Sequence, residues 1–309
     1  MTFLRILAVD AGQTGVRTRV IGSDGSEGVE TEFAGVRTDA PLVPQLAAAV
    51  QAVAAATGPI AVVAVGSTGW TAGSDDAAAL REATAGSGVG QVFFAHDSVT
   101  SYLGALGDAR GAVVAAGTGV VTLAVGADSV ARVDGWGNLM GDAGSGFWIG
   151  RAALDAVMRA HDGRGPQTLL TEAARAEFGD LEHAYIELQA DPGRVRRIAG
   201  YARWVADASE AGDAVAIRVG DAAAGELVLS VTTALRCVGE GSPDAGVPLV
   251  CGLGGVLRSR HIAERFAAGL SEIWPELRVQ PPLGTGLDGA ALLPTLSDDS
   301  ALAAHVARG

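Results

Sequence analysis

The chain contains one arrangement of predicted elements twice: three consecutive strands, followed by helices that alternate with further strands. Short apolar runs that end at Gly, Asp or Ser clusters indicate the strands, and longer Ala-rich stretches indicate the helices. The first copy has predicted strands at 3–9, 16–21, 28–34, 60–66 and 91–95, and predicted helices at 42–57, 75–86 and 97–107. The chain is long enough, at 309 residues, for each copy to form a domain.

The second copy has a long insertion. Its predicted strands are 112–116, 120–126, 129–133, 247–251 and 276–280, with a mostly helical stretch over 145–240 and helices at 259–270 and 287–296. The duplication predicts an α/β protein of two similar domains, each built on a mixed sheet. No Pro-rich or Ser-rich linker separates the copies, so the boundary near 107–111 is predicted to be short, which suits a hinge beside a cleft.

Each copy begins with a strand that ends at a Gly/Thr turn, Asp10–Gly15 in the first copy and Gly117–Gly119 in the second. Such a turn can direct several backbone N–H groups and a Thr hydroxyl at one anion, and small residues let a phosphate approach the backbone. Asp10 adds a carboxylate, which can hold a hydrated Mg²⁺ beside the phosphates. One such turn is usually an ordinary hairpin, but two turns that each begin a copy favour phosphate binding.

A third glycine turn, Val250–Ser259, follows a strand and opens a helix, so its backbone could lie against a base or ribose. The alternative is a dinucleotide-binding turn. Its G-x-G-x-x-G spacing fails here because Leu257 occupies the last Gly position.

The charged residues exclude several classes of function. The net charge is −13, and all 22 basic residues are Arg. Without Lys the chain has neither a Walker A loop nor a Schiff-base amine. An acidic chain also lacks the basic stripe that nucleic-acid binding needs, so no nucleic-acid partner is expected.

The two cysteines, Cys237 and Cys251, lie in apolar surroundings without CxxC spacing, and both are predicted to pack in the core. The N-terminal apolar run lacks the features of a signal peptide, and Gly and polar residues interrupt the longer apolar segments. We therefore expect a cytoplasmic protein without membrane contact.

Three further residues have two interpretations each from local sequence. Asp97 stands between a predicted strand and a predicted helix, and it is either a catalytic base or a helix N-cap. Asp142 lies in a loop too rich in Gly for a helix interior, and it is either the N-cap of a helix that begins near Gly144 or has the role that the resemblance given below implies. Trp136 lies between two glycines and either faces a sugar ring or packs in the core. His96 is expected to point away from Asp97.

Five segments resemble the N-acetylglucosamine kinases and the wider BadF/BadG/BcrA/BcrD ATPase family, in matching order from residue 6 to about 293. That family has a D-G-G-G-T turn, an N-D or T-D pair, a G-T-G-S turn, a G-W-G-x-x-x-G-D-E-G-S segment and a G-G-V turn. The corresponding segments are Asp10–Thr14, His96–Asp97, Gly117–Val120, Gly135–Ser145 and Gly254–Val256. Gly135–Ser145 is the most specific of them.

The resemblance implies an actin-like (ribonuclease H-like) fold, with ATP and a sugar in a cleft between two domains, and a homodimer. The implied domains are 1–108, completed by 287–309, and 109–286. Asp97 would take the proton of the sugar 6-hydroxyl, and Asp10 would hold Mg²⁺ through water. The implied nucleotide-binding residues are Gly12, Gln13, Thr14, Thr118, Gly119, Gly254, Gly255 and Ser259, and the implied sugar-binding residues are Asp39, Asp97, Gly135, Trp136, Gly137 and Asp142.

The chain departs from the family pattern at several positions. Ala11 and Gln13 replace glycines of the first turn, which the turn tolerates if their φ angles are negative. Ala143 replaces a Glu, and Val120 and Val121 replace polar residues, while Asp39 stands where the animal enzymes have a sugar-contacting Asn. These changes leave open whether the sugar is N-acetylglucosamine, glucosamine or another hexose.

Two functions of other classes compete with a kinase. One is an ATPase that activates a dehydratase through an iron–sulfur cluster, but the two cysteines have no recognisable cluster spacing. The other is a sugar-sensing regulator, which would need an additional DNA-binding segment, and the first predicted strand already begins at residue 3. We therefore expect a kinase for an amino sugar.

Overall fold

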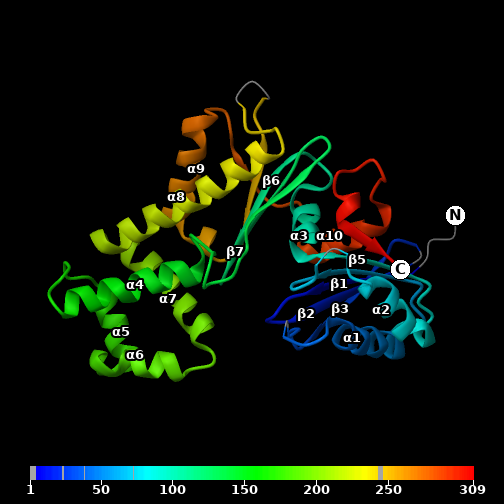
Figure 1. Ribbon diagram of the computed structural model, residues 1–309, viewed down its shortest axis with the longest axis horizontal. Coiled ribbons are helices and arrows are strands. Elements are labelled where there is room, and N and C mark those ends of the chain that lie inside the picture. The colour runs from blue at the N-terminus through cyan, green and yellow to red at the C-terminus, as the bar shows by residue number, and fades with distance from the viewer. Residues whose placement is uncertain (1–4, 23, 38, 72, 243–245) are drawn as a thin grey trace. The chain divides into compact units, whose positions relative to one another are not determined.

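The computed structural model describes residues 5–22, 24–37, 39–71, 73–242 and 246–309. It consists of two compact units, which are described separately (Figure 1). The N-terminal unit comprises Met1–Arg110, Val125–Val130 and Pro281–Gly309, and the C-terminal unit comprises Gly111–Ala124 and Ala131–Gln280.

The N-terminal unit is built on a six-stranded mixed sheet in the order β11-β5-β4-β1-β2-β3. Its strands are β1 (Ile6–Ala11), β2 (Val16–Ile21), β3 (Glu27–Phe33), β4 (Val62–Ser67), β5 (Gln91–His96) and β11 (Val306–Arg308). Its helices are α1 (Leu42–Thr57), α2 (Asp76–Thr84), α3 (Asp97–Leu106) and α10 (Gly286–Leu292). β1 pairs with β4 in parallel and with β2 antiparallel, so the end of β1 at Asp10 lies at the centre of the sheet.

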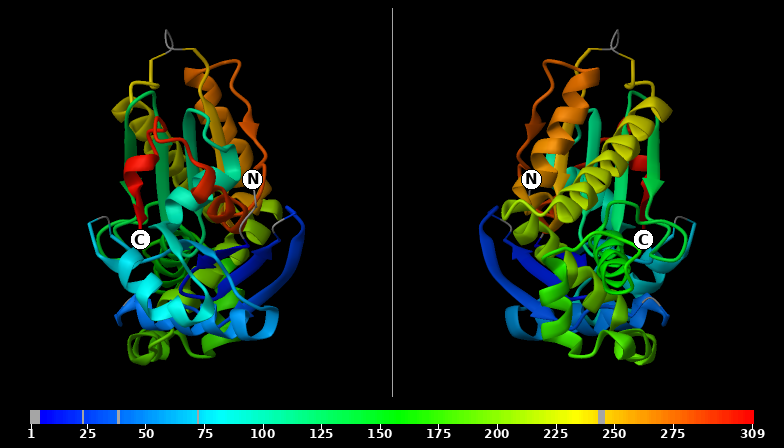
Figure 2. Two further views of the ribbon diagram at one scale, coloured as in Figure 1. Left: turned by 90° about the vertical axis from the view of Figure 1, so that its right-hand side faces the viewer. Right: turned by 90° about the vertical axis from the view of Figure 1, so that its left-hand side faces the viewer.

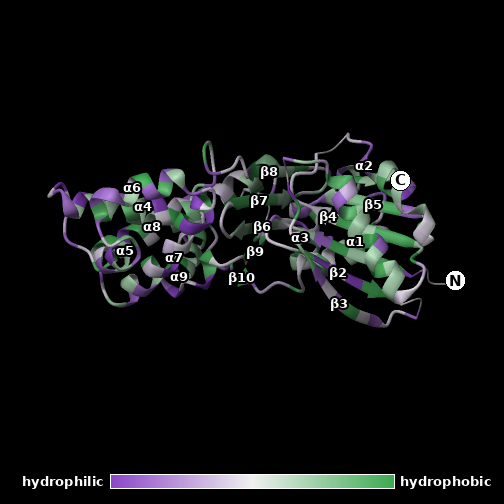
Figure 3. Ribbon diagram, turned by 90° about the horizontal axis from the view of Figure 1, so that it is seen from below, coloured by the Kyte–Doolittle hydropathy of each residue, from purple (hydrophilic) through white to green (hydrophobic). Residues whose placement is uncertain are grey.

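Apolar side chains of the central strands form the core of this unit. Leu7, Val9, Val63, Val65 and Phe94 are buried, as expected for strands that helices cover on both faces. The edge strand β3 differs, because Glu27 to Glu32 are exposed. Figure 3 shows hydrophilic as well as hydrophobic residues along this strand. Charged residues on an edge strand oppose pairing with another chain.

The C-terminal end of the chain forms a strand that the sequence analysis did not predict. β11 pairs antiparallel with β5, with Val306 opposite Ala95, and Figure 2 shows the chain end at the edge of this sheet. A three-residue edge strand depends on its partner more than on its own sequence pattern, so hydrophobic periodicity does not reveal it.

The C-terminal unit contains a five-stranded sheet in the order β10-β9-β6-β7-β8. Its strands are β6 (Gly111–Ala116), β7 (Val120–Val125), β8 (Val130–Asp134), β9 (Leu249–Leu253) and β10 (Val279–Gln280). The predicted helical stretch consists of α4 (Gly146–His161), α5 (Leu170–Phe178), α6 (Leu181–Ala190), α7 (Arg194–Glu210) and α8 (Ala214–Cys237), and α9 is Arg260–Ile273. The predicted α/β class with two mixed sheets is confirmed.

Some predicted boundaries and environments are wrong. The strand expected at 276–280 is only Val279–Gln280, and the closing helix ends as a 3-10 turn at Leu293–Thr295. The first strand begins at Ile6, and the predicted start at residue 3 lies outside the described residues. Cys251 is buried in β9, but Cys237 is exposed at the end of α8, where the helix turns its last residues to solvent. No helix of the described residues is long and apolar enough to cross a membrane.

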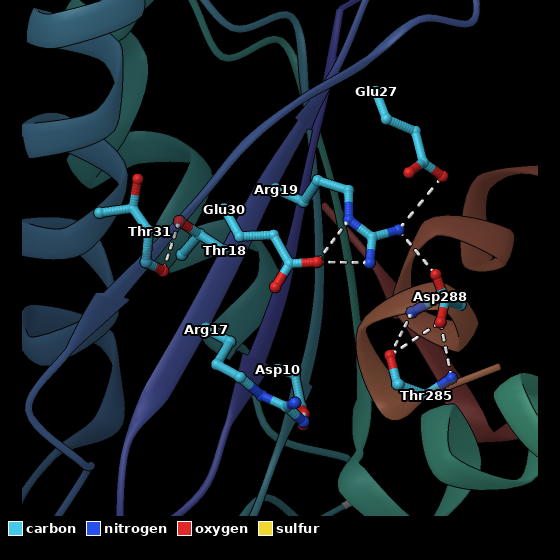
Figure 4. Close-up of polar contacts among 9 residues, drawn as sticks. All are labelled: Asp10, Arg17, Thr18, Arg19, Glu27, Glu30, Thr31, Thr285 and Asp288. Carbon is cyan, nitrogen blue, oxygen red and sulfur yellow. Dashed lines mark hydrogen bonds and ion pairs between the residues drawn. The ribbon is translucent and has the colours of Figure 1, made fainter.

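A largely buried arginine joins three segments of the N-terminal unit (Figure 4). The Arg19 side chain of β2 contacts Glu30 of β3 at 2.7 Å, Asp288 of α10 at 2.6 Å and Glu27 at 3.3 Å. Asp288 also accepts the Thr285 N–H at 2.6 Å and completes a capping box at the start of α10. Arg19 therefore links the helix near the end of the chain to the sheet formed by its beginning.

We expect Arg19→Met to lower the free energy of unfolding by about 1–3 kcal/mol, because hydrogen bonds to charged groups contribute about that much and the carboxylates lose their cation. Urea unfolding measures the change. The control is Arg164→Met, whose partner Asp162 lies in an exposed ion pair, and its effect should stay below about 1 kcal/mol. Equal effects of the two variants would contradict the role of Arg19.

Candidate active site

The first glycine turn joins β1 to β2 in the N-terminal unit. The Gly12 N–H donates to the Gly15 carbonyl at 3.0 Å, and the Gly12 carbonyl accepts the Val36 N–H at 3.0 Å. A Cβ at Gly35 would lie 2.1 Å from the Gln13 carbonyl oxygen, so the neighbouring loop approaches the turn closely. Gln13 and Thr14 are exposed at its tip.

The described non-glycine residues with positive φ are Asp134 and Asp142. The φ angles of Ala11 and Gln13 are therefore not positive, and these side chains fit where the family has glycine. This condition, set from the sequence, is confirmed.

Asp10 ends β1 beside this turn and pairs with Arg17 of β2, with 2.5 Å between its Oδ2 and an arginine nitrogen (Figure 4). Burial raises the pKa of Asp10 above its usual value, the Arg17 hydrogen bond and charge oppose that rise, and the charge of Asp97 adds to it. Among these causes burial is the largest and the charge of Asp97 the smallest.

The Asp10 carboxylate is a possible ligand of a hydrated Mg²⁺. Carboxylate oxygen is a ligand type that Mg²⁺ accepts, and the ion usually keeps several waters and phosphate oxygens. Among the described residues no group of three or more His, Cys, Asp and Glu side chains could enclose a metal. A single carboxylate fits an ion held mainly by water and phosphate, and that is the arrangement the resemblance implies.

Asp97 is the first residue of α3, and His96, the last residue of β5, is the N-cap. The His96 Nδ1 accepts the Ser98 N–H at 3.2 Å and lies 2.9 Å from the Asp97 carboxylate. The N-cap interpretation of Asp97 is therefore wrong, and so is the expectation that His96 points away from it. The backbone turns at the junction of strand and helix, and this places the two side chains on the same side.

Asp39 lies on an exposed loop, and its carboxylate accepts two hydrogen bonds from Arg37 at 2.9 and 3.1 Å. This partner lowers the pKa of Asp39 below its usual value. The carboxylate is thus ionised, and it is already paired within its own loop.

In the C-terminal unit the second and third glycine turns lie together. β6 pairs in parallel with β9, so both strands end at the same edge of the sheet. A Cβ at Gly254 would lie 2.3 Å from the Ala116 carbonyl oxygen, and φ of Gly254 is 96°. Only glycine satisfies both the conformation and the close approach.

The second turn is fixed by its own backbone and by α4. The Gly117 N–H donates to the Gly119 carbonyl at 2.9 Å. The first amides of α4 donate to the same turn, Gly146 to the Gly117 carbonyl at 2.8 Å and Phe147 to the Thr118 carbonyl at 3.0 Å. The helix thus positions the turn through its otherwise unpaired N-terminal amides.

A pocket of about 590 Å³ opens between these turns and α7, within the C-terminal unit. That volume is in the usual range for small-molecule sites. Of the predicted nucleotide-binding residues it brings together Thr118, Gly255 and Ser259. Gly119 and Gly254 lie beside the pocket in the same turns, whereas Gly12, Gln13 and Thr14 belong to the N-terminal unit.

One face of α7 forms the wall of this pocket, and the sequence analysis missed it. Its charged members are Arg196, Arg203, Asp207 and Glu210, at helical spacing along that face. A Cβ at Gly146 would contact Ala199, so the basic half of α7 lies near the second turn. Glu210 lies 4.0 Å from Arg260, which follows Ser259, so its acidic end lies near the third turn. In the sequence, this helical spacing of charged residues is equally typical of a helix face that is exposed to solvent.

Asp142 lies in the loop between β8 and α4, with φ of 61° and 7% of its surface exposed. Its Oδ1 accepts the Val120 N–H at 3.3 Å, and a Cβ at Gly119 would lie 2.7 Å from its Oδ2. The N-cap of α4 is Ser145, whose hydroxyl accepts the Trp148 N–H, so the N-cap interpretation of Asp142 is wrong. The carboxylate instead lies directly against the second turn.

Trp136 is 58% exposed, so its interpretation as a core residue is wrong. The Arg132 guanidinium lies 4.7 Å from the ring centroid. Gly135 and Gly137 on either side both have φ of 79°, a conformation that favours glycine. Asp134, which the sequence analysis also missed, accepts backbone N–H groups from both ends of this loop. An Asp directly before Gly was the available signal, because such residues often bond nearby backbone.

The two mixed sheets and the glycine turns at their strand ends define an α/β protein of two actin-like domains. The family model of the BadF/BadG/BcrA/BcrD ATPases matches residues 7–293, and the chain belongs to that family.

Two curated relatives are similar over part of their length. The chain is 26% identical over 210 residues to the N-acetylmuramic acid/N-acetylglucosamine kinase of Clostridium acetobutylicum, over 66% of this chain and 67% of that protein. It is 28% identical over 197 residues to the N-acetyl-D-glucosamine kinase of Dictyostelium discoideum, over 62% of this chain and 60% of that protein. The match thus spans about two thirds or less of these relatives.

Two solved structures share the fold over nearly all of the chain. One, from Chromobacterium violaceum and described as a candidate N-acetylglucosamine kinase, has a TM-score of 0.74 and 24% identity, covering 95% of this chain and 99% of that one. The other is a ROK family glucokinase from Streptomyces griseus in complex with glucose and AMPPNP, with a TM-score of 0.55 and 19% identity, covering 94% and 98%.

The environment of Asp142 predicts a pH dependence. Burial raises its pKa above 3.8, the backbone N–H of Val120 opposes the rise, and the charge of Asp134 adds to it. A raised pKa means that the carboxylate takes up its proton at a higher pH, so any binding that needs the ionised form is lost earlier on acidification. Because the folded protein binds this proton more tightly than the unfolded chain does, folding stability falls as the pH rises from 3.8 through the raised pKa.

We therefore expect Asp142→Asn to lower kcat/KM for the sugar at least tenfold at pH 7 while raising Tm. It should also remove one component from the acid side of the profile of kcat/KM against pH, leaving the component due to Asp10. Steady-state kinetics from pH 4 to 8 and a thermal melt measure the two effects. A variant with the parent kcat/KM at every pH would contradict the assignment.

Proposed function

We propose that this ATP-dependent sugar kinase transfers the γ-phosphoryl group of ATP to the 6-hydroxyl of an amino sugar, with N-acetylglucosamine the favoured acceptor. The observation that carries the proposal is the contact of Asp142 with the second turn, 3.3 Å from its Oδ1 to the Val120 nitrogen. It places a carboxylate of the type that binds sugar hydroxyls beside a turn of the type that binds phosphate. The names of the curated relatives support this substrate class.

Phosphoryl transfer needs positioning, neutralised charge and a base near the attacking oxygen. In the proposal Thr118, Gly255 and Ser259 bind ATP in the pocket beside α7, where Arg196 and Arg203 supply positive charge. Gly119 and Gly254 shape the same two turns, and Gly12, Gln13 and Thr14 bind phosphate from the N-terminal unit. Mg²⁺, held at Asp10 through water, would neutralise charge on the phosphates.

The sugar in this proposal is bound by Asp39, Asp142, the Trp136 ring and the backbone of Gly135 and Gly137. Asp97 accepts the proton of the sugar hydroxyl, and His96, 2.9 Å away, restricts the orientation of its carboxylate. Asp97 is the first residue of α3, so the start of the helix fixes the position of its backbone.

The two cysteines differ in burial, and this favours a kinase over an ATPase that activates a dehydratase. Cys251 is buried, and burial raises the pKa of its thiol to about 11, whereas Cys237 is exposed. A cluster needs thiolates that meet at one place, and these thiols lie at different depths. An iron determination on the purified protein decides the question, because a stoichiometric cluster would support the activator.

We expect Asp97→Asn to lower kcat by two to four orders of magnitude, the range attributed to a general base, while the KM for ATP stays within about threefold of the parent value. A coupled assay for ADP release measures both. Asp108→Asn is the control, because Asp108 follows α3 and its carboxylate contacts Ser300. Turnover by Asp97→Asn close to that of the control would remove Asp97 from this role.

A substrate panel tests the acceptor: N-acetylglucosamine, glucosamine, N-acetylmuramate and glucose with ATP. We expect N-acetylglucosamine to have the highest kcat/KM, and NMR of the product locates the phosphate. A higher kcat/KM for glucosamine would indicate that the Asp39 carboxylate prefers an ammonium to an acetamide. In that case Asp39→Asn should reduce the preference, and an unchanged preference would count against Asp39.

The remaining parts of the proposal are a cytoplasmic location, which the sequence analysis predicts, and a homodimer, which the family resemblance implies. The dimer is testable directly by light scattering on the purified protein, where the mass of a dimer is twice the 31.0 kDa of the chain. A monomer that phosphorylates its sugar would remove the dimer from the proposal and leave the kinase in place.

A further inference from the structure

One carboxylate closes the loop that connects β8 to α4. The Asp134 Oδ1 accepts the N–H groups of Gly135 at 2.7 Å, Asp142 at 2.8 Å and, more weakly, Trp136 at 3.5 Å. Its Oδ2 accepts the Ala143 N–H at 3.0 Å. Both ends of the nine-residue segment Gly135–Ala143 are thus bonded to one side chain, whose charge strengthens each bond.

The surrounding backbone is shaped around this carboxylate. Asp134 itself has φ of 60°, which is unusual for a residue with a side chain, and Asp is among the residues that adopt it most readily. A Cβ at Gly141 would lie 2.4 Å from the Asp134 Oδ1, so glycine at that position lets the carboxylate reach the Asp142 amide. Strain of this kind persists where the surrounding contacts require it, and it often occurs at functional sites.

The contacts continue from Asp134 to the second turn. Asp134 holds the Asp142 amide, and the Asp142 carboxylate in turn accepts the Val120 N–H and contacts Gly119. The same side chain holds the amides that flank the exposed Trp136 ring. Two of the side chains proposed to bind the sugar, Asp142 and Trp136, therefore depend on one residue that itself need not touch the sugar.

We infer that Asp134 is a positioning residue for the sugar, which holds the loop Gly135–Ala143 closed and thereby fixes the Asp142 carboxylate and the Trp136 ring. The inference rests on the proposed function of that loop. Asp134 is not among the residues that line the nucleotide pocket, and besides its contact with Asp142 the second turn is held by the Gly117 N–H and by the first amides of α4. Loss of Asp134 should consequently affect the sugar and leave the nucleotide.

Two substitutions separate the carboxylate from the strained backbone. Asp134→Gly removes every acceptor and suits the positive φ, so it tests the hydrogen bonds without added strain. Asp134→Asn keeps one oxygen for the Oδ1 bonds and tolerates this φ, but it presents an NH₂ group to the Ala143 N–H. Asp128→Gly is the matched control, because Asp128 is an exposed residue at the opposite end of the β7–β8 hairpin.

Kinetics with both substrates tests the inference on the full-length chain. For Asp134→Gly we expect the KM for the sugar to rise at least tenfold and the KM for ATP to stay within about twofold, since charged hydrogen bonds of this strength correspond to a tenfold effect or more. Asp134→Asn should recover most of the loss, and Asp128→Gly should match the parent. A parent-like KM for the sugar in Asp134→Gly, or an equal rise in both KM values, would overturn the inference.

Hydrogen exchange followed by mass spectrometry gives a readout that does not depend on activity. In Asp134→Gly the peptide containing Gly135–Ala143 should exchange at least tenfold faster than in the parent, with the peptides of β6 and α4 unchanged. Unchanged exchange in that peptide would overturn the inference. If the parent phosphorylates no sugar of the panel but the loop still loses protection, the proposed function fails while the structural role of Asp134 stands.

Discussion

The parallel pairing of β6 with β9, and of β1 with β4, is the constraint on which the candidate site depends. Parallel strands end at the same edge of a sheet, so the turns that follow them are brought together without any contact between their side chains. In the C-terminal unit this places Gly254 against the end of β6 and opens the pocket beside α7. The same geometry places the end of β4, at Ser67, beside Asp10 and Ala11 in the N-terminal unit.

Glycine is needed at these turns because of close approach rather than chain flexibility. Gly35 lies against the Gln13 carbonyl, Gly254 against the Ala116 carbonyl, and Gly146 against the Gly117 carbonyl. In each case a methyl group would collide with backbone, which has no side-chain freedom to yield. This explains why Ala11 and Gln13 can replace glycine in the first turn, where the φ angles are ordinary.

The sequence predicted the elements well where hydrophobic periodicity determines them, and poorly where pairing or side-chain direction does. β1, β4, β5 and β6 are buried strands with a clear apolar pattern, and each was predicted within about three residues of its observed bounds. β11 has no pattern of its own and exists through its pairing with β5. The direction of His96, the exposure of Cys237 and the pocket-lining face of α7 all depend on how a helix begins, ends or packs, which composition does not reveal.

The candidate site shows the same division. Turn chemistry and motif spacing indicated Asp10, Asp97, Asp142 and the glycine turns. Asp134 was missed because a carboxylate that bonds four amides looks in sequence like any Asp before a Gly. The significance of that residue emerges only when residues eight and nine positions away are seen to return to it.

The four carboxylates proposed for the site have different charged and polar neighbours in this chain, whose basic residues are all Arg. Asp39 is exposed and paired with Arg37, and its pKa is lowered. Asp10 also has an arginine partner, but burial outweighs it and the pKa is raised. Asp142 has a backbone amide in place of a cation, and its pKa is raised as well. The neighbours of the Asp97 carboxylate are the His96 imidazole, 2.9 Å away, and the N-terminus of α3.

The pKa directions of these carboxylates indicate which of them would gain from a bound cation. Burial is the largest cause of the raised pKa of Asp10, and the charge of Asp97 is the smallest contribution. In the proposed function a cation bound at Asp10 would favour the ionised form of that carboxylate, whereas Asp39 already has the Arg37 guanidinium as its partner. In the proposed function the loop that Asp134 closes positions two of the sugar-binding side chains, and backbone amides hold the Asp134 charge in place.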